Sequence, residues 1–539
     1  MSPFEQVRMN IPPKIPLKLV SLANLTVEEK ATSFSRLDEE AIKSLFPKTY
    51  GNSAITFVEG ESQGNTPKRV GVCFSGGQAP GGHNVIISLY RGLKQLNQNS
   101  ILYGFIGGPN GFLKQEYIEL NADRLALYLN QGGFDLIGSG RTKIETPAQF
   151  ELAATCAKAL ALDGLVIIGG DDSNTNAALL AEYFLSIGLS TSVVGVPKTI
   201  DGDLRNDQIE IPFGFDTACK VYANLIGNIQ RDALSAKKYY HFIKLMGRTA
   251  SHIALECALK THPNYTLIGE DVFSKKRSLK DIVEILAAVV EVRSNLGIDY
   301  GVILLPEGVL EFTSDYSTLL KELNGVLEKA TSIHDTQPQE KIEFVISQLP
   351  TQSKLYTSLP QKIQLQLLLD RDSHGNLNVS KIETEALLIE LVSIELENRR
   401  AEGGYKGQFN PQPHFFGYEG RSSTPSNFDA NYCYALGLVA ALLINFRLTG
   451  YIATISNLRA QPALWQPGAL PLTSMLTMET RKGKLKPVIR KALVDLEGAA
   501  FLKFAAMRAM LAVEDDYLYP EPMQFFGPEE ITDTCPLTL

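Results

Sequence analysis

Cysteine is scarce in this 539-residue sequence, and its placement excludes two classes of small stabilised protein. The six cysteines are far apart, with neither a CxxC pair nor the Cys/His spacing of a metal site. We therefore expect neither a disulfide framework nor a structural zinc site. Such sparse cysteines are typical of a reducing compartment, so the sequence predicts a cytoplasmic protein. The cysteines are Cys73, Cys156, Cys219, Cys257, Cys433 and Cys535.

Excess positive charge and long apolar runs are also missing. The chain has 51 Lys and Arg against 59 Asp and Glu, and no basic stripe interleaved with aromatic residues. Nucleic acid is therefore not an expected partner. No segment reaches about 18 uninterrupted apolar residues, and the N-terminus lacks the apolar core of a secretory signal. We expect neither export nor a membrane span, but rather a globular protein with two packed domains and insertions.

Short β-rich runs alternate with helical stretches from Lys68 onward. The runs RVGVCF, LDGLVIIG and TSVVGVP are each followed by a polar loop, and the first two loops lead into amphipathic stretches. This alternation predicts βαβ units and a mostly parallel sheet covered by helices on both faces. In open sheets of this kind, ligands bind beyond the carboxyl ends of the strands.

The pattern divides the chain into five parts. Residues 1–68 are an N-terminal extension, and 69–212 form a first α/β lobe that part of 421–539 completes. Residues 213–311 form a second α/β lobe, with HFIKLMGR, TLIGE and YGVILLPEG as strands. Residues 312–405, which include KIQLQLLLDRD, show helical periodicity and are read as an insertion. Residues 406–539 return to both lobes.

Three polar, glycine-containing loops follow strands of the first lobe: SGGQAPGGHN (75–84), GGDDSNTN (169–176) and PKTIDGDLRND (197–207). Because the carboxyl ends of parallel strands share one edge of a sheet, these loops should converge on one site. Paired glycines expose backbone N–H groups to phosphate oxygens. One such loop alone is weak evidence, because glycines often only tighten a turn.

The same loops bring four carboxylates together: Asp171, Asp172, Asp201 and Asp203. Crowded carboxylates repel one another unless cations or proton transfer make use of them, so a magnesium-phosphate site explains the group. For any single aspartate, a helix cap or an Asx turn is the simpler explanation. For the group, the magnesium-phosphate interpretation is favoured.

Five motifs follow one another along the chain: GGDD-S, PKTIDGD, MGR (246–248), PEG (306–308) and GYEGR (417–421). With these motifs in this order, the sequence resembles the phosphofructokinase family from about residue 69 to 450. The resemblance implies an α/β fold of two doubly wound, Rossmann-like lobes. In that family the phosphoryl donor binds one lobe, and fructose 6-phosphate binds in the cleft between the two.

The resemblance also implies roles for the PKTIDGD loop. Asp201 matches the catalytic base that accepts the proton of the sugar's 1-hydroxyl. Thr199 and Ile200 match positions that hold the sugar end. Asp171 and Asp203 match the acidic residues around Mg²⁺, the expected cofactor.

Two positions distinguish the phosphoryl donors of the family. ATP-using members carry glycine where this chain has Asp172 and again where it has Lys198. The charged pair resembles the pyrophosphate-dependent members, in which the carboxylate excludes the nucleotide and the ammonium grips a short donor. The resemblance further implies pyrophosphate contacts at Gly77 and Gly170, and a weaker one at Arg141.

Three alternatives remain open at this stage. Asp172 can be a helix cap and Lys198 a solvated lysine of the loop. The chain can then be an ATP-dependent phosphofructokinase. It can also be a noncatalytic regulatory subunit, although an intact TIDGD motif argues against a chain without catalysis.

The remaining motifs imply a sugar-phosphate site. The resemblance assigns to it Met246, Gly247, Arg248, Glu307, Tyr418, Glu419, Gly420 and Arg421. ATP-dependent relatives bind the 6-phosphate with arginines of a neighbouring subunit, whereas the matching positions here are Tyr239, preceded by Lys238, and Gln412. Lys238 and Tyr239 either reach across the interface of an expected homodimer or belong to an ordinary edge strand.

Overall fold

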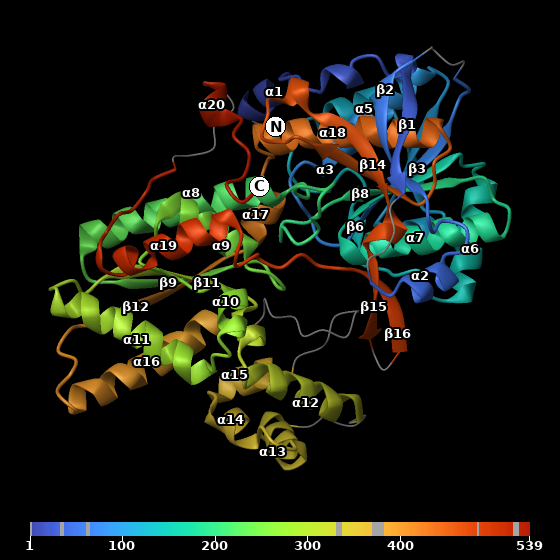
Figure 1. Cartoon of the computed structure of the whole chain (residues 1–539). Coiled ribbons are helices and arrows are strands. Elements are labelled where there is room, and N and C mark those ends of the chain that lie inside the picture. The colour runs from blue at the N-terminus through green and yellow to red at the C-terminus, as the bar shows by residue number, and fades with distance from the viewer. Residues whose placement is uncertain are drawn as a thin grey trace.

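A computed structural model describes residues 3–32, 37–60, 65–329, 337–368, 382–481, 484–520 and 528–539. Two lobes, each built on its own sheet, lie side by side in Figure 1, and a group of helices extends from the smaller lobe. The helices include the short α1 (Pro3–Met9), α2 (Glu39–Leu45), α4 (Pro109–Lys114), α5 (Ala122–Ala126) and α20 (Glu529–Thr532).

The larger lobe contains a ten-stranded sheet in the order β1-β2-β14-β13-β8-β7-β3-β4-β5, with β6 beside β3. The run from β13 to β4 is parallel, and the outer strands β14, β2, β1 and β5 are antiparallel to their neighbours. Strands from both ends of the chain therefore complete the predicted parallel core. The strands are β1 (Leu25–Thr32), β2 (Ser53–Glu59), β3 (Arg69–Ser75), β4 (Ile101–Phe105), β5 (Tyr117–Leu120), β6 (Ser139–Gly140), β7 (Gly164–Gly169), β8 (Ser192–Pro197), β13 (Tyr451–Ser456) and β14 (Gln466–Pro471).

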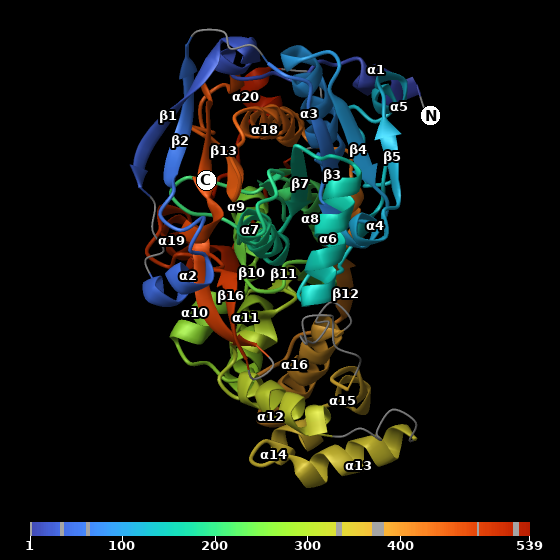
Figure 2. The ribbon, with the colours of Figure 1, turned by 90° about the vertical axis from the view of Figure 1, so that its right-hand side faces the viewer.

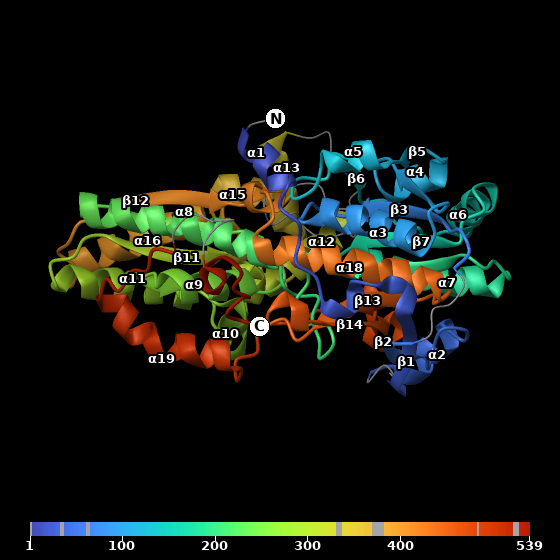
Figure 3. The same cartoon turned by 90° about the horizontal axis from the view of Figure 1, so that it is seen from above.

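Helices cover both faces of this sheet because alternate residues of its strands point to opposite sides. On β3, Val70 and Phe74 pack toward α3 (Gly82–Leu96) and α18 (Asn427–Asn445), whereas Cys73 packs toward α6 (Pro147–Ala159) and α7 (Asp171–Ser186). Figure 3 shows α3 and α18 side by side. Among the described residues, α18 alone has the length and apolarity of a membrane span, and 94% of that stretch is buried inside the protein.

The smaller lobe contains a parallel sheet in the order β10-β11-β9-β12. Helices α8 and α9 pack on one face, and α11 and α16 on the other. The prediction of two doubly wound α/β lobes with a helical insertion is confirmed. The elements are β9 (Tyr240–Leu245), β10 (Tyr265–Thr266), β11 (Gly301–Pro306), β12 (Pro411–Phe416), α8 (Phe215–Ala236), α9 (His252–Thr261), α11 (Leu279–Asn295) and α16 (Thr384–Ala401).

Three local predictions need correction or lie partly outside the described residues. TLIGE forms a strand only over its first residue, because β10 ends at Thr266 and α10 (Gly269–Ser274) takes up the glycine and glutamate. The edge-strand reading of KKYY is wrong, since β9 pairs with β11 on one side and β12 on the other. KIQLQLLLDRD forms α15 (Gln361–Gln366), and its residues from 369 lie outside the described part.

The insertion helices α12 (Tyr316–Lys329), α13 (Pro338–Gln348), α14 (Ser353–Ser358) and α15 share one hydrophobic cluster with α11 and α16. Figure 2 shows them at the end of the molecule farthest from the large sheet. The Lys244 ammonium on β9 ties this region to the sheet, because it lies 3.0 Å from the Glu385 carboxylate and donates to the Ile382 carbonyl.

The C-terminal part crosses between the lobes. The hairpin of β15 (Leu476–Arg481) and β16 (Lys484–Ile489) packs against α7 and α2, and the chain then runs to α19 (Ala499–Val513) on the smaller lobe (Figure 1). Buried hydrogen bonds fix this crossing segment. The Ala492 N–H donates to the Asp203 carbonyl at 2.8 Å, and the Val494 N–H donates to Glu270 Oε1 at 2.9 Å.

Candidate active site

A polar cavity of about 560 Å³ lies between the lobes at the carboxyl ends of their strands. The three loops after β3, β7 and β8 all line it, which confirms that they converge. The smaller lobe contributes residues that follow β9, β11 and β12. The lining consists of residues 75–78, 139–143, 170–173, Asn176, Lys198, Thr199, Asp201, Met246, Arg248, Glu307, Tyr418, Arg421 and Ser422.

Helix α7 begins at the cavity, directly after Gly170. No side chain caps this end of the helix, so its first N–H groups and the positive end of its dipole face the cavity region. Asp171 and Asp172 occupy the first turn, where that dipole favours negative charge. The sequence therefore places two carboxylates at a helix end that also suits phosphate oxygens.

Lys198 has an unusual environment for a lysine. It is 4% exposed, and its ammonium donates to the Gly77 carbonyl at 2.8 Å. Burial, assisted by the positive charges of Arg421 and Arg141, lowers the pKa of Lys198 to about 7, although Asp201 and Asp171 act in the opposite direction. The cavity thus holds a lysine that gains or loses its charge near neutral pH.

Arginine side chains add to this positive side of the cavity. Arg421, on α17 (Tyr418–Ser422), donates from Nη1 to the Gln78 carbonyl at 3.4 Å and from Nε to Met246 Sδ at 2.8 Å. A Cβ at Gly77 would lie 2.8 Å from Arg421 Nη1 and 3.7 Å from Arg141 Nη2. Glycine at this position therefore leaves room for two guanidinium groups beside the loop.

Asp172 is held by a residue that the sequence reasoning missed. The Lys143 ammonium lies 3.1 Å from Asp172 Oδ1, with both side chains about a quarter exposed or less. Lys143 lies two residues after Arg141, for which the resemblance implies a phosphate contact. That short distance along the chain is the sequence feature that could have indicated Lys143.

Asp201 lines the cavity, and its side chain is 18% exposed. Its Oδ1 atom is buried and has no hydrogen-bond partner among the described residues, while Arg421 Nη2 lies 4.0 Å away. The Asp201 N–H donates to Thr199 Oγ1 at 3.1 Å, which fixes the loop around the carboxylate. A buried acceptor without a donor is costly for folding, which indicates that Asp201 is retained for a role other than stability.

Asp171 and Asp203 converge on one cation position, which Lys491 occupies. Lys491 Nζ lies 3.5 Å from Asp171 Oδ2 and 3.7 Å from Asp203 Oδ2, and it donates to Thr249 Oγ1 at 3.2 Å. Burial raises the pKa of Asp203 to about 6, against the opposing charge of Lys491. Nothing in the sequence connects Lys491 with these aspartates, because it lies far along the chain.

This pair of carboxylates fits a magnesium ion. Mg²⁺ prefers oxygen ligands, binds through one or two carboxylates and keeps several waters. Among the described residues no group of three or more His, Cys, Asp or Glu is arranged as a metal cage. Asp171 and Asp203 already share a cation, so they suit an ion completed by water and phosphate oxygens.

The predicted sugar-phosphate residues fall into two groups. Met246, Arg248, Glu307, Tyr418 and Arg421 line the cavity. The others do not line it: Ile200, Gly247, Glu419 and Gly420.

Two of the residues outside the lining support it. The Gly247 N–H donates to Glu307 Oε1 at 3.2 Å, so the backbone orients that buried carboxylate. Gly420 permits close packing, because a Cβ there would lie 2.5 Å from the Tyr222 ring. These residues shape the wall without facing the cavity.

Lys238 and Tyr239 lie far from the cavity within the chain. They precede β9, whereas Met246 and Arg248 follow it, so the whole length of that strand separates them. A strand of this length spans roughly 20 Å. The structure does not bring Lys238 and Tyr239 to the site of their own chain.

The architecture is thus that of a two-lobed α/β protein with a strongly charged cavity between its lobes. The sequence profile of the Phosphofructokinase family matches residues 69–343. The chain belongs to the phosphofructokinase family.

Related proteins extend the match to nearly the whole chain. A pyrophosphate–fructose 6-phosphate 1-phosphotransferase of Porphyromonas gingivalis is 49% identical over 543 residues, covering 100% of this chain and 98% of that protein. The beta 1 subunit of the Arabidopsis thaliana enzyme of that name is 50% identical, covering 95% and 90%. A crystal structure of a pyrophosphate-dependent phosphofructokinase from Nitrosospira multiformis matches with a TM-score of 0.55 at 16% identity, covering 84% and 93%, which shows the shared fold alone.

Proposed function

We propose that the protein transfers a phosphoryl group from pyrophosphate to the 1-hydroxyl of D-fructose 6-phosphate, giving fructose 1,6-bisphosphate and phosphate. The reaction is reversible and serves glycolysis or gluconeogenesis. The observation that carries this proposal is the charged pair Asp172 and Lys198 within one cavity. The names of relatives about 50% identical support the same reaction.

The charges on the two sides of the cavity support pyrophosphate as the phosphoryl donor. Asp172, held by Lys143, adds negative charge and bulk where ATP-using members of the family have glycine, so a nucleotide is disfavoured. Lys198, Arg421 and Arg141 gather beside the Gly77 backbone, where they can bind the oxygens of a short, highly charged donor. Pyrophosphate carries no nucleotide and is short and highly charged, so it fits both sides of the cavity.

The acceptor chemistry is assigned to Asp201. The Asp201 carboxylate, which lines the cavity with a partly exposed side chain, takes the proton of the sugar's 1-hydroxyl as the hydroxyl oxygen attacks the near phosphorus atom. A new P–O bond forms to the sugar, the bridging P–O bond of pyrophosphate breaks, and orthophosphate leaves. Lys198 and Arg421 neutralise the charge of the leaving phosphate.

Magnesium is the proposed cofactor, and Asp171 and Asp203 are the residues that would hold it. When bound, such an ion neutralises charge on the phosphate oxygens and orients them. Sugar-phosphate binding is assigned to Arg248, Glu307 and Arg421, which line the smaller-lobe side of the cavity.

A homodimer and a cytosolic location complete the proposal. Lys238 and Tyr239 lie at the far end of β9, so they can serve a sugar-phosphate site only in a second copy of the chain. All six cysteines are unpaired, and five are buried, which suits a reducing compartment.

The test measures initial rates with fructose 6-phosphate and Mg²⁺, with pyrophosphate and ATP offered separately. We expect turnover with pyrophosphate and at least about a hundredfold lower kcat/KM with ATP. Equal or faster turnover with ATP would contradict the donor assignment. A folded chain that turns over neither donor would instead be a regulatory subunit.

A further inference from the structure

Lys491 reaches into the active site from the segment that crosses between the lobes. We propose that its ammonium is a resident counter-ion for Asp171 and Asp203, which a divalent cation displaces when it binds. The displaced side chain then moves into a neighbouring cavity. The inference rests on the proposed function only in taking these two aspartates as the cation site.

The three groups form a compact cluster. Lys491 Nζ lies within 3.7 Å of a carboxylate oxygen of each aspartate, and Thr249 bridges the same groups, since its hydroxyl lies 2.9 Å from Asp203 Oδ2. Asp203 is only 5% exposed, so water screens its charge poorly. An ammonium at this position compensates both carboxylates before any metal arrives.

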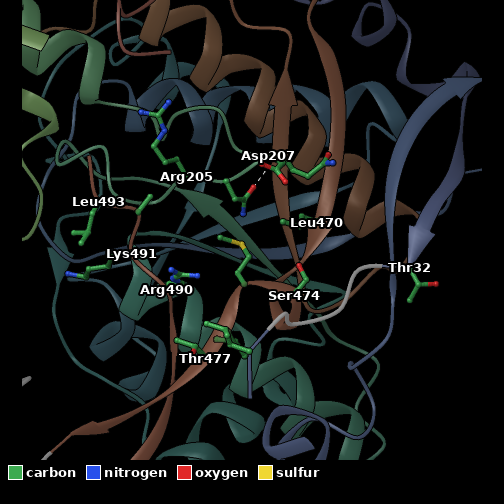
Figure 4. Close-up of a pocket in the computed structure, with 15 residues that line it drawn as sticks. Thr32, Arg205, Asp207, Leu470, Ser474, Thr477, Arg490, Lys491 and Leu493 are labelled. Carbon is green, nitrogen blue, oxygen red and sulfur yellow. Dashed lines mark hydrogen bonds between the residues drawn. The ribbon is translucent and has the colours of Figure 1, made fainter. Parts of the chain in front are cut away.

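Lys491 also borders a second cavity, of about 870 Å³, which lies outside the catalytic cavity described above. Figure 4 shows Lys491 at one side of the residues that line it, next to Arg490 and Leu493. Lys491 thus lines the second cavity and contacts Asp171, which lines the catalytic cavity. It has space to withdraw into when another cation takes its place.

Hydrogen bonds fix the backbone on both sides of Lys491, whereas only its ammonium end is held by Asp171, Asp203 and Thr249. The Ala492 N–H donates to the Asp203 carbonyl at 2.8 Å, and the Ala492 carbonyl accepts from His252 Nε2 at 2.9 Å. On the other side, the Arg490 N–H donates to the Met475 carbonyl at 3.1 Å. Displacement thus needs only rotation about the flexible four-carbon stem of the lysine.

Competition follows from the geometry. A metal ion bound by Asp171 and Asp203 occupies the position that the ammonium holds, and two cations at that distance repel each other. The enzyme therefore binds the metal less tightly than it would without Lys491. In return, the aspartates stay in place when no metal is present.

The test compares Lys491→Met with the matched variant Arg490→Met, whose side chain is exposed and neighbours Lys491. Mg²⁺ binding is measured by titration calorimetry without pyrophosphate or sugar phosphate. We expect roughly three- to tenfold tighter binding in Lys491→Met and unchanged affinity in Arg490→Met. Unchanged or weaker binding in Lys491→Met would overturn the proposal.

Thermal unfolding of the same variants gives a second readout. Without metal, Lys491→Met should melt at a lower temperature than the wild type, and Mg²⁺ should raise its Tm by more. An equal Mg²⁺-induced rise in both proteins would contradict displacement. Because no substrate is present, these results do not depend on which phosphoryl donor the enzyme uses.

The wild-type protein provides a test that needs no variant to fold. Lysines are labelled with acetic anhydride with and without Mg²⁺, and the labelled sites are quantified by mass spectrometry. Labelling of Lys491 should increase severalfold with Mg²⁺. Labelling of Lys486, which lies on the β15–β16 hairpin and pairs with Glu145, should not change. Constant or decreased labelling of Lys491 would refute its withdrawal.

Discussion

The Lys143 ammonium and the Asp172 carboxylate lie 3.1 Å apart at the start of α7. The pair joins two loops of the larger lobe that meet at the catalytic cavity. Asp172 thereby keeps a fixed direction even though the first turn of the helix leaves its side chain partly exposed. Under the proposed donor assignment, selection against ATP depends on the position of this carboxylate as well as on its charge.

Lys143→Met should therefore weaken donor selection. Without its partner, the Asp172 side chain can turn away, and the ratio of kcat/KM for pyrophosphate to that for ATP should fall about three- to tenfold. Parallel initial-rate measurements with both donors check this. Lys158→Met, at an exposed position of α6, is the control. An unchanged ratio in Lys143→Met would show that Asp172 needs no support.

Lys198 should make catalysis pH-dependent near neutrality. Its pKa in the free enzyme is lowered to about 7, so the ammonium is present below that pH and lost above it. The kcat/KM for pyrophosphate should therefore fall as the pH rises through about 7. Bound pyrophosphate stabilises the ammonium, so kcat should change less than kcat/KM.

Lys198→Arg provides the comparison for this pH profile. Arginine stays charged over the whole range, so the part of the decline caused by Lys198 should disappear. Ionisation of pyrophosphate itself affects both enzymes equally, and the ratio of their profiles removes it. The same decline in both enzymes would assign it to another group.

Gly77→Ala tests the close approach of arginine to the loop after β3. The new methyl group would meet Arg421 Nη1 at 2.8 Å, so the guanidinium must move. We expect the KM for pyrophosphate to rise about tenfold with little change in Tm. Gly325→Ala, on α12, where a Cβ meets no atom within 4 Å, should leave the kinetics unchanged. A wild-type KM in Gly77→Ala would contradict the crowding argument.

Tyr222→Phe tests the support of α17. The Tyr222 hydroxyl donates to the Gly417 carbonyl at 2.6 Å, next to the helix that carries Tyr418 and Arg421. Its loss should cost about 1 kcal/mol of stability and raise the KM for fructose 6-phosphate severalfold. Tyr356→Phe removes a similar hydrogen bond, to the Gln364 carbonyl in the insertion. Tyr356→Phe should lose comparable stability while its KM for fructose 6-phosphate stays unchanged. An equal rise of this KM in both variants would contradict a specific role of α17.

Much of the fold was predictable because it depends on local patterns. The strands β3, β7 and β8 are short apolar runs bounded by glycine loops, and each has the length and composition of a buried parallel strand. Part of residues 421–539 is expected from the sequence to complete this lobe, but the individual strands within 25–59 and 451–471 were not predictable. Their pairing with β8 and with each other depends on contacts between distant parts of the chain.

The residues of the site also divide into those that local sequence patterns predict and those that depend on contacts between distant parts of the chain. Asp171, Lys198 and Asp201 lie in loops whose position follows from the strands before them, so their convergence was predictable. Lys491 reaches Asp203 only because buried hydrogen bonds of residues 492–494 hold the crossing segment against the smaller lobe. No sequence pattern around Lys491 indicates that tertiary contact.

The most direct test of the account compares wild type with Asp201→Asn. The formation of fructose 1,6-bisphosphate from pyrophosphate and fructose 6-phosphate is measured together with calorimetric binding of both substrates. Asparagine keeps the shape of the side chain but cannot take the proton, so kcat should fall about 10²- to 10⁴-fold while both substrates still bind. An Asp201→Asn enzyme that retains more than about a tenth of the wild-type kcat would contradict the assignment of Asp201 as the base.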